Sequence, residues 1–147
     1  MARPVTPEAL RGFIENYVRD YPKITGEKNI WQSPLLVTAK ADSCFDILPQ
    51  IAANDHVLPK DLLATARSVI VLFVPFTKEL AKENHKGDIP CRNWGLAYES
   101  TNTLINNLTG QIKLFLEDTG YKSALVPATH NFDHKKLMAR WSHKHLG

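Results

Sequence analysis

The 147-residue sequence has few cysteines, no long hydrophobic run and no apolar leader. Its two cysteines, Cys44 and Cys91, are too few for a disulfide framework, and neither belongs to a C-x-x-C pair. A zinc ribbon and an iron–sulfur cluster held by this chain are therefore not expected. The longest apolar run, Val69 to Phe76, is far too short to cross a bilayer. With no signal peptide either, we expect a cytoplasmic protein with no membrane partner.

Several catalytic loops are also missing. The sequence contains neither of the glycine-rich phosphate-binding patterns, G-x-G-x-x-G and G-x-x-x-x-G-K-[ST], and no G-x-S-x-G nucleophile elbow. Cys44 lies beside Phe45 and is expected to be a small core residue. Cys91 follows Pro90 in a loop and is only a weak candidate for a reactive thiol.

The composition itself is that of an ordinary globular domain, with 44% hydrophobic and 22% charged residues. The net charge of +3 is concentrated in residues 130–147, where four basic residues stand against Asp133 alone. Four of the six histidines also lie there. The end of the chain is therefore basic and histidine-rich, whereas the remainder is balanced.

The hydrophobic pattern predicts helices that alternate with strands. A first helix is expected from Pro7, capped by Thr6 and ended by Pro22, and the longest helix is expected over 95–119, with Gly120 as its C-cap. Between these two helices the pattern predicts a strand over 35–41, a short helix capped by Asp42 or Ser43, a helical turn over 61–66, a strand over 68–76 covered on both faces and a long binding loop or lid over 77–91. After the longest helix it predicts a strand over 123–127 and a last helix from Asp133 or Asn131. This order favours an α/β (α+β) layered domain over 1–147, with a small mixed sheet flanked by helices. Three strands are few, so the sheet could be incomplete.

Two regions could carry chemistry. In the tail, the loop formed by Thr129, His130 and Asn131 before a basic helix offers a hydroxyl, an imidazole and an amide to an anion or a cofactor, and Asp133 could donate or accept a proton there. As a helix cap, Asp133 would instead hold backbone N–H groups and keep a low pKa, and this interpretation is favoured. A metal site on His130 and His134 is disfavoured, because a helix that begins at Asp133 leaves His130 outside it, and a solvated basic helix end explains most of the remaining tail.

The second region opens the long helix. Trp94 and Tyr98 are one helical turn apart, a spacing that usually indicates core packing. Alternatively, this helix start and the preceding loop form one wall of a ligand cleft. Asn102 and Asn106 are polar positions in an otherwise apolar helix and could hydrogen-bond a neighbour or a ligand.

Three stretches, Ala66 to Phe76, Trp94 to Ile105 and Pro127 to His145, together resemble the N-terminal domain of epoxyqueuosine reductase-like iron–sulfur proteins, also described as electron-transport proteins. The segment His56 to Leu63 agrees with them. The resemblance runs from about Trp31 to the end, and the order and spacing of the stretches carry it.

The resemblance implies a fold like that of cobalamin-processing proteins and nitroreductases. It implies that Tyr98, Asn102, Thr129 and His130 border a cobalamin cleft, with Asp133 as the nearest candidate for the proton donor. It places every [4Fe–4S] ligand in a ferredoxin-like domain beyond residue 147, so the 147 residues are expected to be the N-terminal part of a longer reductase and inactive alone. Partners would be that domain or a separate redox protein.

Two other functions stay open. The domain could be a non-enzymatic electron carrier or a docking module, whose basic tail meets an acidic partner or, more weakly, tRNA. A self-sufficient metal enzyme built on the histidines is the least favoured. The substrate and the oligomeric state are not indicated by the sequence.

Overall fold

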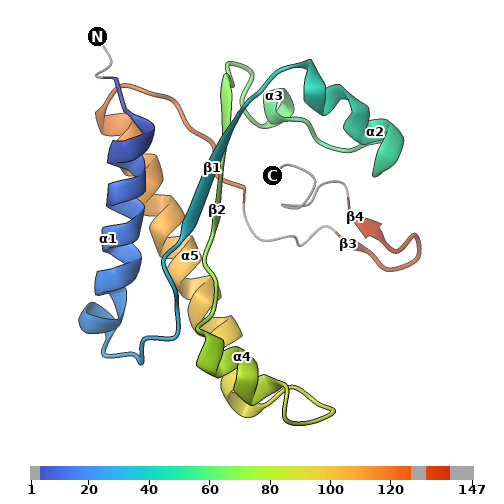
Figure 1. The fold of residues 1–147 in the computed structure, drawn as a ribbon. Helices are drawn as coiled ribbons and strands as arrows, with labels where there is room; N and C mark the ends of the chain where they lie inside the picture. The colour runs from blue at the N-terminus through green and yellow to red at the C-terminus, as the bar shows by residue number, and fades with distance from the viewer. Residues whose placement is uncertain (1–3, 127–131, 140–147) are drawn as a thin grey trace. The chain divides into compact units, whose positions relative to one another are not determined.

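The computed structural model describes residues 4–126 and 132–139, which belong to two units (Figure 1). Unit 1 combines the N-terminal segment up to Leu36 with Leu72–Tyr121. Unit 2 combines Val37–Val71 with the segment from Lys122 onward. Helices and strands are mixed, and the architecture is of the α+β kind.

Unit 1 is a helical layer in which α1 (Pro7–Thr25) packs alongside α5 (Arg92–Asp118), and α4 (Lys78–Asn84) packs against α5 (Figure 1). The two long helices meet through apolar residues spaced three and four apart, which is the spacing of one helical face. Those buried on α1 are Leu10, Ile14, Val18 and Tyr21, and those on α5 are Ala97, Leu104, Leu108 and Ile112. The predicted 77–91 loop therefore contains a helix that the sequence interpretation missed.

Helix α1 begins as predicted and ends later than predicted. The Thr6 hydroxyl accepts a hydrogen bond from the Ala9 N–H at 3.1 Å, which satisfies one free donor of the first turn. The predicted end at Pro22 is wrong, because the helix continues to Thr25 and closes at Gly26, whose φ of 73° is left-handed. Pro22 lies in the last turn of the helix, where its missing N–H removes only one intrahelical hydrogen bond. Its ring is buried, as is the Tyr21 side chain.

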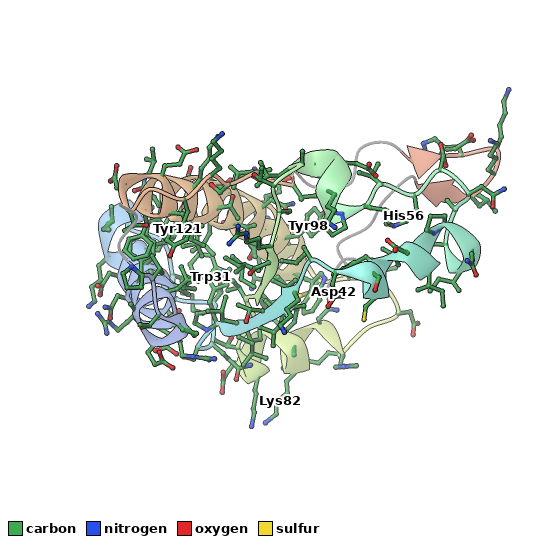
Figure 2. All side chains as sticks on the ribbon, turned by 90° about the horizontal axis from the view of Figure 1, so that it is seen from above. Trp31, Asp42, His56, Lys82, Tyr98 and Tyr121 are labelled. Carbon is green, nitrogen blue, oxygen red and sulfur yellow. The ribbon has the colours of Figure 1, made fainter. Side chains whose placement is uncertain are left out.

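An aromatic and polar cluster fixes the segment after α1 inside unit 1 (Figure 2). The Trp31 ring meets the Tyr21 ring edge-on, with centroids 5.7 Å apart. The buried indole N–H donates to the Thr101 hydroxyl at 2.8 Å, and that hydroxyl donates to the Ala97 carbonyl on the preceding turn of α5. A second ring pair, Phe13 with Phe115, stacks at 5.1 Å between α1 and α5.

The sheet contains two strands, β1 (Leu35–Lys40) and β2 (Ser68–Phe73), and is antiparallel. Beside it, Trp31 pairs with Phe76, and the Thr77 N–H donates to the Ile30 carbonyl at 2.9 Å. The expectation that β2 is covered on both faces is wrong, since Phe73 is 61% exposed and the central residues are only half-buried.

The third predicted strand is wrong over 123–126, which form no regular structure; Pro127 lies outside the described residues. A strand needs a neighbouring strand to pair with. In this short apolar run, Val126 instead packs against Leu48. Within 4–126 and 132–139, the strand pairs are antiparallel, so the mixed sheet that was expected is not formed there.

Unit 2 contains short helices around Leu48, which packs with Phe45, Val57, Leu58 and Val126. The helices are η1 (Ser43–Ile47), α2 (Leu48–Ile51) and α3 (Pro59–Leu62), the last slightly earlier than the turn predicted over 61–66. The predicted cap is confirmed, because the Asp42 carboxylate accepts from the Cys44 N–H at 3.0 Å. Cys44 is exposed, so its predicted core position is wrong; the cap turns it outward.

The last predicted helix is also wrong in its described part. Strands β3 (Phe132–Asp133) and β4 (Met138–Ala139) form a small antiparallel hairpin, with Phe132 opposite Ala139 and Asp133 opposite Met138. Leu137 closes the turn with a φ of 53°, a left-handed conformation that breaks a helix. Residues 140–147 lie outside the described residues.

Candidate functional site

The N-terminal half of α5 carries two of the predicted site residues, Tyr98 and Asn102. They are one turn apart and therefore lie on the same side of the helix. Tyr98 is 63% exposed, and Asn102 is half-buried. Trp94, one turn earlier, packs edge-on against Phe76 with ring centroids 4.9 Å apart. The core interpretation holds in part for Trp94, which is half-buried, and fails for Tyr98, whose side chain is exposed.

This side of α5 borders the buried stripe that holds the helix in place. Ile105 and Thr109 continue the line of Tyr98 and Asn102, and both are half-buried. Leu104 and Leu108, on the neighbouring stripe, are fully buried. The packing of these leucines fixes the backbone that carries Tyr98 and Asn102, which lowers the cost of binding a ligand there.

The connection between α4 and α5 is fixed at its base. The Asn84 side chain accepts from the Cys91 N–H at 3.0 Å, and the Asn93 amide donates to the Glu83 carboxylate at 2.7 Å. Between these bonds, residues 85–90 are all exposed, and Ile89 is 79% exposed. The predicted lid is therefore a short loop with an anchored base.

Asp133 is placed in unit 2, at the start of the β3–β4 turn. Its carboxylate accepts from the backbone N–H groups of Lys135 at 2.8 Å and Lys136 at 3.1 Å. These hydrogen bonds lower the pKa of Asp133 below its usual value, first through Lys136 and then through Lys135. This matches the capping interpretation, although the carboxylate caps a hairpin turn rather than a helix.

Two other predicted site residues in the tail, Thr129 and His130, lie outside the described residues. Tyr98 and Asn102 are brought together on one helix of unit 1, and Asp133 belongs to unit 2. In the described part of the tail, the turn exposes His134, Lys135, Lys136 and Leu137.

The sequence interpretation missed one pair of titratable side chains, Asp42 and Cys44. The Asp42 carboxylate is hydrogen-bonded to Cys44 and raises the pKa of the Cys44 thiol above its ordinary value. The backbone bond from Cys44 lowers the pKa of Asp42 in turn. Asp42 was predicted to cap a helix, but the Cys44 thiol that it contacts was predicted to lie in the core.

The described residues give no sign of a metal centre or of a membrane span. Across 4–126 and 132–139, no three His, Cys, Asp or Glu side chains gather as metal ligands would. Among the helices of those same segments, none has the length and apolar character needed to cross a bilayer. No protein-family model, curated protein or solved structure matches the chain.

Proposed function

We propose that the chain is the N-terminal domain of an epoxyqueuosine reductase-like iron–sulfur redox protein and contributes one wall of a corrinoid or related redox-cofactor cleft. The three sequence stretches described above support this, and the single structural observation behind it is the Tyr98–Asn102 pair on α5. An exposed aromatic ring beside a half-buried amide suits, in kind, a flat macrocycle that carries amide groups at its rim. The fold would then be of the cobalamin-processing and nitroreductase-like type.

In this proposal, bound cobalamin supplies the electron transfer to the substrate. The role of this chain would be to help hold the cofactor through Tyr98 and Asn102, and the sequence resemblance implies that Thr129 and His130 contribute as well. With two cysteines, the 147 residues cannot ligate a [4Fe–4S] cluster by themselves, so the electrons would come from clusters held elsewhere. The isolated chain is then expected to be inactive.

The part proposed for Asp133 is narrower than a simple proton donor. Its two backbone hydrogen bonds hold it as a carboxylate near neutral pH. Because these bonds lower the pKa of Asp133, the protonated form needed for proton donation is disfavoured, whereas the carboxylate can accept a hydrogen bond from the substrate. Asp133→Ala in the complete reductase is expected to abolish turnover, and retained turnover would remove Asp133 from the reaction.

A titration with hydroxocobalamin tests the cofactor wall directly. The wild-type chain should shift the absorbance of the corrinoid and gain thermal stability, and Tyr98→Ala and Asn102→Ala should both weaken these effects. Thr103→Ala is the matched control, because Thr103 is exposed and lies about 100° around α5 from Asn102 and about 140° from Tyr98. No spectral or thermal change at high micromolar ligand would refute a corrinoid site.

The exposed turn of the β3–β4 hairpin favours a second candidate, a non-enzymatic electron-carrier or docking module. Lys135 and Lys136 stand beside the exposed Leu137, as in a small basic contact surface. If tRNA is the partner, anisotropy with labelled tRNA should show binding that falls steeply as salt is raised. Lys135→Gln/Lys136→Gln should then weaken it, and equal binding by this variant would refute the role of the hairpin.

A further inference from the structure

Two isoleucines and their polar neighbours form an exposed surface on the short helices of unit 2. Ile47 and Ile51 are four positions apart on η1 and α2, about one helical turn, and they are 50% and 66% exposed. Asp46 and Gln50, each one position before an isoleucine, are exposed beside them. These four residues, with Asp42 at the start of η1, are the α2 surface.

The charge of this region is negative. Residues 40–59 contain three aspartates and one lysine, a net charge of −2. The pKa of the exposed Cys44 thiol is raised mainly by Asp42 and also by the charge of Asp46, so both carboxylates act on this part of the surface. Lys40 offsets part of the charge and helps to lower the pKa of Asp42, after the larger effect of the hydrogen bonds from Cys44. A partner of the α2 surface should therefore be basic as well as apolar.

The hairpin turn between β3 and β4 has this complementary character. Lys135 and Lys136 are exposed, and Leu137 beside them is 76% exposed. Residues 132–139 carry a net charge of +1, because Asp133 offsets one lysine. The Asp133 carboxylate accepts hydrogen bonds from the backbone N–H groups of both lysines, which holds the turn in one shape. The hairpin turn therefore presents two cations and one apolar side chain on a preformed support.

Neither surface is covered by the other within one chain. Both belong to unit 2, but the two isoleucines and Leu137 each keep half or more of their surface exposed. Among the described residues, the ion pairs involve neither lysine of the hairpin turn nor Asp46. A second copy of the chain supplies each surface with its complement, and two copies related by a two-fold axis would satisfy both contacts at once.

We propose that the chain pairs with a second copy of itself, with the hairpin turn of each copy seated on the α2 surface of the other. The lysines of the turn meet the aspartates of the α2 surface, and Leu137 packs against the two isoleucines. The pairing goes beyond the cofactor proposal, since every residue in it belongs to unit 2, and it gives the docking candidate above a specific partner. A uniformly anionic partner such as tRNA could meet the hairpin turn but would be repelled by the α2 surface.

Charge reversal in the whole chain tests the pairing. Lys135→Glu/Lys136→Glu makes the hairpin turn acidic, and Asp46→Lys/Gln50→Lys makes the α2 surface basic while the Asp42 cap stays. Each variant alone then carries two surfaces of like charge. In sedimentation equilibrium its self-association should weaken at least about tenfold, because ion pairs are lost and repulsion is added at both contacts. An equimolar mixture of the two variants should regain the dimer, since each hairpin turn again finds an α2 surface of opposite charge.

Two further variants separate charge in general from this contact. Lys82→Glu/Lys86→Glu is the matched control, because it reverses the same number of charges at exposed positions of unit 1, and it should leave the dimer unchanged. Ile51→Ser should weaken the dimer of the otherwise unchanged chain, because it removes an exposed apolar side chain from the α2 surface.

Several results would overturn the pairing. They are a chain that stays monomeric up to about 1 mM, an equal loss in the unit 1 control, a mixture no more associated than its components, and an Ile51→Ser variant that pairs normally. Assembly beyond a dimer would overturn the reciprocal arrangement. Salt-sensitive tRNA binding by a chain that stays monomeric would overturn the second copy as the partner and leave the docking candidate standing.

Discussion

The buried Trp31–Thr101 hydrogen bond should be a main determinant of the stability of unit 1. Replacing Thr101 by valine keeps the shape of the side chain and removes the acceptor that lies 2.8 Å from the indole nitrogen. Trp31 is 4% exposed, so its N–H cannot turn to water instead. A buried donor left without a partner costs about 1–3 kcal/mol. Thr101→Val should therefore lower the free energy of unfolding by about that amount.

Urea unfolding followed by circular dichroism measures this loss. With an m value of about 2 kcal/mol/M, the midpoint should fall by about 0.5–1.5 M. Thr103→Val is the matched control, because the Thr103 hydroxyl is exposed and bonds only to the carbonyl of Glu99 on its own helix. It should change stability by less than about 0.5 kcal/mol.

A double-mutant cycle with Trp31→Phe separates the hydrogen bond from other effects of the substitution. Phenylalanine has no N–H to leave unpaired, so Thr101→Val should cost much less in that background. An equal cost in both backgrounds, or a Thr101→Val variant as stable as Thr103→Val, would refute the reasoning.

Three further outcomes follow from the described contacts. Asp42→Asn should lower the pKa of the Cys44 thiol toward its ordinary value, so alkylation of Cys44 at pH 8 should accelerate while Cys91, the internal reference in mass spectrometry, stays constant; an unchanged ratio would contradict the Asp42 effect. Leu104→Ala, at a side chain with no exposure, should cost about 2–5 kcal/mol in urea unfolding, and a cost below that range would mean that the α1–α5 contact adapts freely. Leu137→Gly should relieve a left-handed leucine and stabilise the hairpin by up to about 1 kcal/mol, seen as a higher melting temperature; a lower one would show that the exposed side chain contributes packing.

Local signals in the sequence predicted the parts of the fold that local chemistry determines. Thr6 before Pro7 indicated the start of α1, and Asp42 indicated the cap of η1, because a side-chain oxygen satisfies free N–H groups in any context. The long helix was predicted for another local reason, because its apolar stripe repeats over many turns. The predicted strand over 35–41 is β1, one residue shorter.

The failures come from positions where the rest of the chain decides. Pro22 was predicted to end α1, but the helix continues for three more residues, and the Pro22 ring is buried. Met138 and its neighbours have helical spacing, yet Leu137 turns left-handed and the chain pairs as a hairpin. In the candidate site, the four-residue spacing of Tyr98 and Asn102 predicted that they share one side of α5. The exposure of that side could not be predicted, because it depends on which elements pack beside it.

The interrupted course of unit 1 has a consequence for synthesis on the ribosome. The apolar face of α1 is complete by Thr25, but α5, which covers it, ends only at Asp118. At about 5–20 residues per second, that face waits roughly 5–20 seconds for its partner helix. During this interval the nascent chain exposes Ile14 and Val18, which are buried in the finished protein. Chaperones that bind apolar segments would therefore have time to bind α1 before its partner helix has been made.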